Sequence, residues 1–404
     1  MKLLDGVRVV ELGHWVAGPA VAGMLADWGA EVYKLEPPGG DPMRRLNQNY
    51  SGGFETRVPA FDLDNRGKRS VAVDLKTDDG LELARRLIAT ADVFVTNVRL
   101  SALEKLQLDH TTLLGRHPRL IYALVTAHGM EGPARDEPGY DSGGFWARSG
   151  VADRFTPPAQ APPLIAGAFG DHITSMFAAG AVLGGLYYRE RHGVGQLVTT
   201  SLLRAGVYTV SGDLATISEL GKLAAPKTRV TNRNPMMNCY RAGDGKWFWL
   251  LGADSQRHFP LVAKAIGQPE LADDDRFSNP QQRRRHGTEL VGILDAAFAA
   301  DDRDGWARRF ADLDVWWAPV TTVEDLVDDP QAAAAGAFVR MASADPGRAG
   351  PVRVPAGPVD FSAAPVTCVG PPPEVGQHTA EVLNGLGIDP AEQRRLAETG
   401  VVKL

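Results

Sequence analysis

The sequence predicts an α/β protein, with a doubly wound parallel sheet in its first part and a smaller α+β domain after it. Two observations predict the sheet: short apolar runs alternate with helical patterns along residues 7–126, and their spacing fits parallel βαβ units. A third observation concerns the rest of the chain, where long helical segments and a candidate hairpin replace this alternation after residue 150. The ligand of a doubly wound sheet is expected at the carboxyl ends of its strands.

The large domain contains five expected strands. The apolar runs that we interpret as strands lie at residues 7–12, 31–35, 71–75, 93–97 and 120–126. Between the first two, Pro19 suits the first position of a helix, and apolar residues follow it at helical spacing. A second helix is expected over residues 81–91.

The second part of the chain is predicted to be mainly helical. Two long helices are expected at residues 171–191 and 200–220. A hairpin follows, because residues 242–245 are turn-forming and lie between two short strand-like runs at 238–241 and 246–251. The remaining helices are expected at residues 259–266, 290–298, 304–313, 378–386 and 390–399.

The composition indicates an ordinary enzyme. The chain has 404 residues, of which 44% are hydrophobic and 23% charged, and its net charge of -6 argues against a nucleic-acid partner. With only two cysteines, neither a disulfide framework nor a Cys-rich metal site is expected, and a reducing, cytoplasmic location fits. No secretory signal and no apolar run long enough to span a bilayer is visible, so we expect no membrane partner.

The most informative residue is Asp171. It is the one fully charged residue between Arg154 and Arg189, and His172 follows it. An ionised carboxylate in apolar sequence needs a reason, because removing it from water is costly. One interpretation is an N-cap for the helix that follows, which is the commonest use of such an Asp. The other is a carboxylate held in a dry pocket for nucleophilic or acid/base chemistry.

The loop after the first strand is a second candidate. Residues 13–19 lie where a dinucleotide-binding protein has its Gly-x-Gly-x-x-Gly turn, but that spacing is absent. A phosphate would still be stabilised by the N-terminus of the helix that begins there. Taken alone, His14 in this loop is interpreted as a turn residue whose ring is satisfied by local hydrogen bonds.

A basic cluster at residues 65–70 precedes the third strand. Its Lys68 and Arg69 are interpreted as solvated loop residues, whereas Lys76 stands at the carboxyl end of the strand and suits a polyanionic ligand. Neither a Gly-x-Ser-x-Gly nucleophile elbow nor a Walker phosphate loop occurs. The histidines are scattered and form no His-x-x-x-His pair, so no metal site is predicted.

Several blocks of the chain, taken together, resemble the family III CoA-transferases, a group that includes formyl-CoA transferase and carnitine CoA-transferase. Residues 65–76 look like that family's Asn-x-x-Lys-Arg-Ser strand, and Gly170-Asp171 matches its nucleophile. The other matching blocks lie at residues 5–12, 18–19, 25–32, 91–97, 138–141, 319–320, 329–331 and 378–383. Each block is weak alone, but the ordered set covers essentially the whole chain.

The resemblance implies a Rossmann-like large domain at residues 1–225, a small α+β domain at 226–330, and a C-terminal segment at 331–404 that returns to the large domain. It also implies an interlocked homodimer, in which two ring-shaped chains pass through each other. The implied reaction moves CoA from an acyl-CoA donor to a carboxylic acid acceptor, with CoA as a substrate and no tightly bound cofactor. Asp171 would form first an aspartyl anhydride and then an aspartyl-CoA thioester.

The same resemblance assigns the residues that contact CoA. They are His14, Val16, Ala17, Val73, Lys76, Asn97, Lys105 and Tyr140. The chain departs from the family at Lys105, where Arg is common, and at Pro37, where some members have a basic residue. The glycine-rich loop of formyl-CoA transferase is not visible either, and residues 232–237 occupy its place.

Three other functions are alternatives to CoA transfer. An α-methylacyl-CoA racemase would need a His where this chain has Tyr140 and a Glu near Asn238, and neither residue present is a base at neutral pH. A non-catalytic CoA-binding protein has no use for Asp171, and a nicotinamide oxidoreductase would be expected to have the missing glycine motif. The donor and acceptor acids stay open. Residues 247–249 (Trp-Phe-Trp) suit an acyl pocket or, more often for strand aromatics, ordinary packing.

Overall fold

A computed structural model describes residues 2–49, 58–226, 228–342 and 350–404. The chain divides into two compact units. The large unit comprises residues 1–153, 162–223 and 333–404, and the small unit comprises residues 154–161 and 224–332. The chain passes between the units four times: within α6 (Val151–Phe155), between residues 161 and 162, between residues 223 and 224, and within α15 (Pro330–Ala334).

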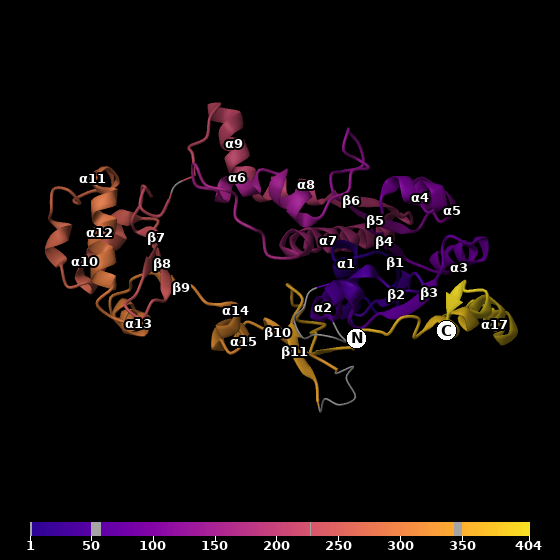
Figure 1. The fold of residues 1–404 in the computed structure, drawn as a ribbon. Helices are drawn as coiled ribbons and strands as arrows, with labels where there is room; N and C mark the ends of the chain where they lie inside the picture. The colour runs from indigo at the N-terminus through magenta and orange to yellow at the C-terminus, as the bar shows by residue number, and fades with distance from the viewer. Residues whose placement is uncertain (1, 50–57, 227, 343–349) are drawn as a thin grey trace. The chain divides into compact units, whose positions relative to one another are not determined.

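The large unit is built on a seven-stranded sheet (Figure 1). Its strands lie in the order β13-β3-β2-β1-β4-β5-β6, and β13 alone runs antiparallel to its neighbour. Their bounds are β1 (Arg8–Leu12), β2 (Glu31–Glu36), β3 (Arg69–Val73), β4 (Val93–Thr96), β5 (Ile121–Thr126), β6 (Gln196–Ser201) and β13 (Val402–Lys403). The direction in which successive strands are added reverses between β1 and β4, which is where doubly wound sheets bind ligands.

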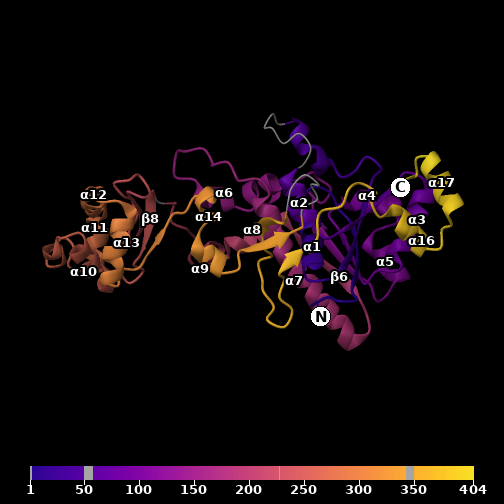
Figure 2. The same ribbon diagram turned by 90° about the horizontal axis from the view of Figure 1, so that it is seen from below.

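Helices cover both faces of this sheet, because its central strands are apolar on both sides. Val9 and Val95 point to one face, where they pack with α1 (Ala17–Asp27) and α7 (Phe169–His192). The alternate residues Val10 and Phe94 point to the other face. The helices on that face are α3 (Asp78–Ile88), α4 (Leu100–Leu106), α5 (His110–Arg116), α16 (Thr379–Gly385) and α17 (Pro390–Glu398). Figures 1 and 2 both show α17 beside α3, although the two helices are far apart in the sequence.

Shorter elements complete the large unit. The helical ones are η1 (Pro42–Asn49), α2 (Pro59–Asn65), η2 (Ser142–Ala147), α8 (Leu202–Thr209) and α9 (Ser211–Leu220). A second sheet has three strands, which are β10 (Phe338–Met341), β11 (Val352–Pro355) and β12 (Cys368–Val369). Within the described residues, no helix combines the length and the hydropathy needed to cross a membrane.

The small unit has a three-stranded sheet of β7 (Met237–Arg241), β8 (Trp247–Leu251) and β9 (Trp317–Pro319). Its helical elements are α10 (Ser255–Ala265), η3 (Pro269–Ala272), α11 (Pro280–Arg285), α12 (Gly287–Phe298), α13 (Arg303–Asp312) and α14 (Val323–Leu326). Phe248 is fully buried in an aromatic core, whereas Trp247 and Trp249 are 39% and 42% exposed on the other face of β8. Ordinary packing therefore accounts for Phe248 only.

The structure confirms the five strands expected in the large domain and the hairpin of the small one. The single helix expected over residues 200–220 is wrong. Residues 196–201 form strand β6 beside β5, and the chain then forms two helices, α8 and α9. Ser201 ends the strand and its side chain accepts a hydrogen bond from the Arg204 backbone N–H, which caps α8.

Candidate active site

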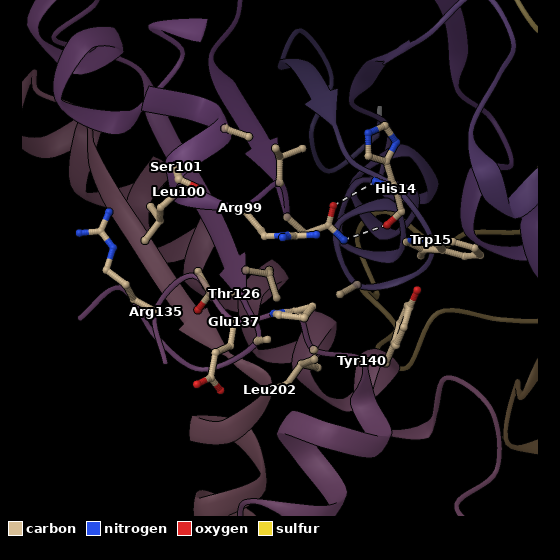
Figure 3. Close-up of a pocket in the computed structure, with 18 of the residues that line it drawn as sticks. His14, Trp15, Arg99, Leu100, Ser101, Thr126, Arg135, Glu137, Tyr140 and Leu202 are labelled. Carbon is tan, nitrogen blue, oxygen red and sulfur yellow. Dashed lines mark hydrogen bonds between the residues drawn. The ribbon is translucent and has the colours of Figure 1, made fainter. Parts of the chain in front are cut away.

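The loop between β1 and α1 is fixed to the residue that follows β4. The Asn97 side chain accepts a hydrogen bond from the His14 backbone N–H at 3.0 Å and donates one to the His14 carbonyl at 2.8 Å (Figure 3). A Cβ added to Gly13 or Gly18 would lie 3.1 or 2.9 Å from the Asn97 side-chain oxygen. These two glycines therefore allow a close approach by Asn97, although they do not form the dinucleotide-binding motif.

A buried ion cluster supports this loop from the sheet side. The Lys34 ammonium lies 2.8 Å from one oxygen of Glu11 and 2.9 Å from Asp41, and it donates to the Gly13 carbonyl at 3.2 Å. Asp41 in turn accepts a hydrogen bond from the Trp15 backbone N–H. Burial alone would raise the pKa of Glu11, but Lys34 and Lys68 hold it below its usual value. The carboxylate therefore stays ionised and the lysines stay paired with it.

Lys68 belongs to the same cluster, so its interpretation as a solvated loop residue is wrong. Its ammonium lies 2.6 Å from the second Glu11 oxygen, 2.8 Å from the Pro19 carbonyl and 3.0 Å from the Asn65 side-chain oxygen. Three acceptors supplied by the protein replace water around this cation, although burial still lowers the pKa of Lys68 to about 8. Lys68 thus ties the start of β3 to β1 and to the first turn of α1.

A cavity of about 550 Å³ opens at the carboxyl ends of β1, β4 and β5. It gathers seven of the residues that the sequence singled out, namely His14, Val16, Ala17, Asn97, Lys105, Tyr140 and Asp171. Val73 and Lys76 lie outside it: Val73 is buried at the end of β3 beside β13, and Lys76 is exposed in the turn that follows. Figure 3 shows Trp15 and Tyr140 on the same side of the pocket as His14, with Ser101 and Arg135 across from them.

The cavity also contains cations that sequence reasoning missed. Arg99 and Arg135 line it together with Lys105. The acidic residues that line it are Glu137 and Asp171. Arg135 also forms an ion pair with Glu104 at 2.7 Å. Both arginines lie in irregular segments with no motif around them, so only the clustering of basic residues near strand ends would have indicated them. Several cations at one mouth favour a polyanionic ligand.

Asp171 lies on the first turn of α7, at the edge of this cavity. The N-cap interpretation of Asp171 is wrong. The N-cap position belongs to Ala168, which has a left-handed backbone with φ of 64° and makes no side-chain cap hydrogen bond. Gly170 lets the turn pack tightly, since a Cβ there would lie 2.5 Å from the Phe145 side chain. The Asp171 carboxylate is therefore free of a capping role.

The surroundings of Asp171 disfavour its negative charge. Burial is the main cause, and repulsion from Asp141 adds to it, so that the pKa of Asp171 rises to about 7. Asp141 is itself buried and accepts hydrogen bonds from the Ser142 and Gly170 backbone N–H groups. Near neutral pH, Asp171 is thus divided between its protonated and ionised forms, and a carboxylate in such a setting is a more reactive nucleophile than one in water.

His14 is not the satisfied turn residue that its loop position suggested. Its Nδ1 is buried and has no hydrogen-bond partner within the described part of the chain. Burial lowers the pKa of the imidazole, so the ring is neutral at physiological pH. The neutral ring lines the cavity, where a ligand can contact it.

Residues 232–237, which occupy the place of the family's glycine-rich loop, are fixed by asparagine side chains that donate to backbone carbonyls. In the small unit, the Asn232 side chain donates to the Met237 carbonyl and the Asn234 side chain donates to the Gly252 carbonyl. Asn238 is 2% exposed and its side-chain amide donates to the Arg229 carbonyl. These asparagines shape the entry to β7.

Comparisons with known proteins identify the family of this chain. The sequence model of CoA-transferase family III matches residues 4–379. The chain is 34% identical to (R)-2-hydroxy-4-methylpentanoate CoA-transferase of Clostridioides difficile, over 99% of this chain and 100% of that protein. It is 30% identical to cinnamoyl-CoA:phenyllactate CoA-transferase of Clostridium sporogenes, over 98% and 96%.

A solved structure shows the same fold. The crystal structure of a CaiB/BaiF family protein from Brucella suis superposes with a TM-score of 0.83 at 31% sequence identity, covering 95% of this chain and 99% of that one. The match to the family model and the similarity to these relatives extend over nearly the whole chain. The protein is therefore a member of CoA-transferase family III and an enzyme that transfers CoA.

Proposed function

We propose that the enzyme transfers CoA from an acyl-CoA thioester to a carboxylic acid, with Asp171 as the nucleophile. The observation that carries the proposal is the position of Asp171 in the cavity that also contains His14, Asn97, Lys105 and Tyr140. The cavity has the size of an ordinary small-molecule site and basic residues at its mouth, which suits the phosphates of CoA. The strand order supports a Rossmann-like use of the sheet, with the ligand at the β1/β4 switch point.

The proposed reaction needs no net proton transfer. An ionised oxygen of Asp171 attacks the thioester carbonyl, the C–S bond breaks, and CoA leaves as a thiolate while an acyl-aspartyl anhydride forms. The thiolate attacks the aspartyl carbonyl, which releases the donor acid as a carboxylate and leaves an aspartyl-CoA thioester. The acceptor carboxylate then repeats both steps in reverse order and leaves with CoA. Water must be kept out, because it would hydrolyse either intermediate.

The test is to trap the covalent intermediates. The protein is incubated with an acyl-CoA, treated with hydroxylamine or borohydride, and digested for peptide mass analysis. A modification on Asp171 is expected in the wild type and none in Asp171→Ala, whose transferase activity should fall by at least about 10³-fold because the covalent path is lost. Full activity in Asp171→Ala would contradict the mechanism.

The acceptor is proposed to be a 2-hydroxy acid. Two relatives that match nearly the whole chain are named for 2-hydroxy-4-methylpentanoate and phenyllactate, both of which are 2-hydroxy acids. A panel that pairs each 2-hydroxy acid with its deoxy analogue, and adds dicarboxylic acids, tests this specificity. Higher kcat/KM for the hydroxy member of each pair is expected, and a preference for dicarboxylic acids would contradict the proposal.

The racemase alternative is disfavoured by the residues present. Tyr140 is 61% exposed and Asn238 is an amide bonded to the backbone, so neither supplies a proton-transfer group. Incorporation of solvent deuterium at Cα of an acyl-CoA would revive that alternative.

We also propose the assembly that the family resemblance implies. The large domain would comprise residues 1–225, the small domain 226–330 and the returning segment 331–404, in an interlocked homodimer located in the cytoplasm. The pairing of β13 with β3 supports the return of the C-terminal segment to the large domain. Light scattering of the purified enzyme should give twice the mass of one chain.

A further inference from the structure

A histidine next to the nucleophile is held by a buried carboxylate from a distant part of the chain. His172 Nε2 lies 3.1 Å from Asp64 Oδ1, and the side chain of Asp64 is only 6% exposed. Asp64 lies near the end of α2, which packs on α1, and α1 packs on α7. Asp64 and His172 line a second cavity together with residues of α1, and neither of them lines the pocket that contains Asp171.

Asp64 favours the protonated form of His172. The hydrogen bond to Asp64 is the main cause that raises the pKa of His172, and Asp171 and Asp141 add to it. The imidazolium attracts the Asp171 carboxylate, while Asp141 and Asp64 repel it. An ion pair between Arg66 and Asp27 lines the second cavity with His172. The other charged or titratable groups that line the pocket of Asp171 are His14, Arg99, Lys105, Arg135 and Glu137.

We infer that His172, fixed by Asp64, is a positioning residue whose positive charge favours the ionised form of Asp171, which attacks the thioester. The inference rests on the proposed function of Asp171. His172 itself touches no reacting atom in this scheme; it acts through the charge on its neighbour. Burial and two carboxylates oppose the ionisation of Asp171, and a cation on the neighbouring residue offsets part of that opposition.

Enzyme kinetics in two variants tests the inference. In His172→Gln the Asp64 carboxylate stays while the cation is lost, so the acid limb of the kcat/KM profile should move to higher pH. The loss of activity is expected to be roughly three- to tenfold greater at pH 6 than at pH 8.5. In His172→Gln/Asp64→Asn the repelling carboxylate is gone as well, and the limb should move back toward the wild-type position.

The control is His192→Gln, which removes an exposed histidine near the other end of α7 and should leave the limb in place. A loss that is equal at every pH, or a double variant whose limb lies no nearer the wild type than that of His172→Gln, would overturn the inference.

A second measurement does not depend on activity or on the variants of His172 being stable. The imidazole of His172 is titrated by NMR in the wild type and in Asp171→Asn, where it should lose its proton at lower pH because an attracting carboxylate is missing. No change in its titration would overturn the inference. The two proposals can fail separately. If the trapping experiment finds no adduct on Asp171 in the wild type, the proposed function is wrong, but the NMR titration still measures the coupling between His172 and Asp171.

Discussion

Asp171 is one of three carboxyl groups that meet near the start of α7. Asp141 and Asp64 both act against its ionisation, and His172 acts in favour of it. The pKa of about 7 places the switch between its reactive and unreactive forms in the physiological range. The same feature that makes the carboxylate reactive should also cost stability, since the folded protein resists a charge that the unfolded chain accepts.

Replacing Asp171 by Asn is expected to stabilise the protein at pH 8 and to change its stability little at pH 4. Burial and Asp141 raise the pKa of Asp171 to about 7 in the folded state, whereas the unfolded value is about 3.9. The folded state therefore keeps a proton that the unfolded state has lost, so this group lowers the free energy of unfolding as pH rises from about 4 to about 7. The gain at pH 8 is on the order of 1–2 kcal/mol, since solvent screens part of the charge.

Chemical denaturation at pH 4, 6 and 8 measures this effect. Asp5→Asn removes an exposed carboxylate of the large unit and serves as the control, for which no such trend is expected. A gain for Asp171→Asn that is as large at pH 4 as at pH 8 would speak against the electrostatic origin.

At the scale of elements, the first turn of α7 is positioned by its fit against η2. Gly170 lies against Phe145, which is fully buried, and the Gly170 N–H donates to Asp141 at the start of η2. The turn that carries Asp171 is thus held by its close approach to Phe145 and by the hydrogen bond from Gly170 to Asp141.

Gly170→Ala should therefore disturb both stability and activity. The new methyl group would lie 2.5 Å from Cβ and Cγ of Phe145, so the turn must shift. The free energy of unfolding is expected to fall by about 1–3 kcal/mol. The value of kcat should fall as well, even at temperatures where the variant is fully folded, because Asp171 moves with the turn. Gly180→Ala, on an exposed and uncrowded part of the same helix, is the matched control and should be neutral or stabilising. Wild-type kcat in Gly170→Ala would contradict this account.

The sequence predicts those parts of the fold that have a clear period or an apolar run. The central strands were found because they are buried on both faces. Strand β6 was missed because it is a half-exposed strand of mixed polarity at the edge of the sheet, and its β-branched residues at 198–200 were the available signal. The helices α4 and α5 and the strand β9 are short, and short elements have little periodicity to detect.

The site was predictable where its residues follow strand ends. His14 and Asn97 could be placed at one edge because parallel strands end together. The pairing of Lys34 and Lys68 with Glu11 could not be predicted. In the sequence, charged residues near strand ends look solvent-exposed, and only the structure shows that a carboxylate on another strand lies next to them. The contact of His172 with Asp64 joins residues 108 positions apart, and no local pattern reports such a distance.

At the scale of the whole molecule, the large unit is assembled from three separate segments. Its third segment contributes α16, α17 and β13, whose apolar residues enter the same core as those of α3 and β3. Val401 and Val402 are 5% and 3% exposed, and the Asp74 N–H donates to the Val401 carbonyl at 2.8 Å. The edge of the sheet beside β3 is thus covered by residues from far along the chain.

A chain that stops after Gly400 is expected to be less stable by about 3–5 kcal/mol, because two buried valines and the ladder with β3 are lost. A chain that stops after Lys403 removes only Leu404, which is 48% exposed, and should be nearly unchanged. Thermal unfolding of both variants measures the difference. Equal melting temperatures for the two truncations would show that β13 contributes little.

The place of β13 in the sheet also bears on the order of folding during synthesis. All other strands of the large sheet leave the ribosome before residues 402–403, so the edge at β3 stays open until these two residues have emerged. The small unit, apart from residues 154–161, is one continuous stretch at 224–332 and can complete its core earlier. Between the end of β6 at Ser201 and the start of β13 at Val402, about two hundred residues are added while the edge at β3 is unpaired, and chaperone contact in that period would protect the nascent large unit from aggregation.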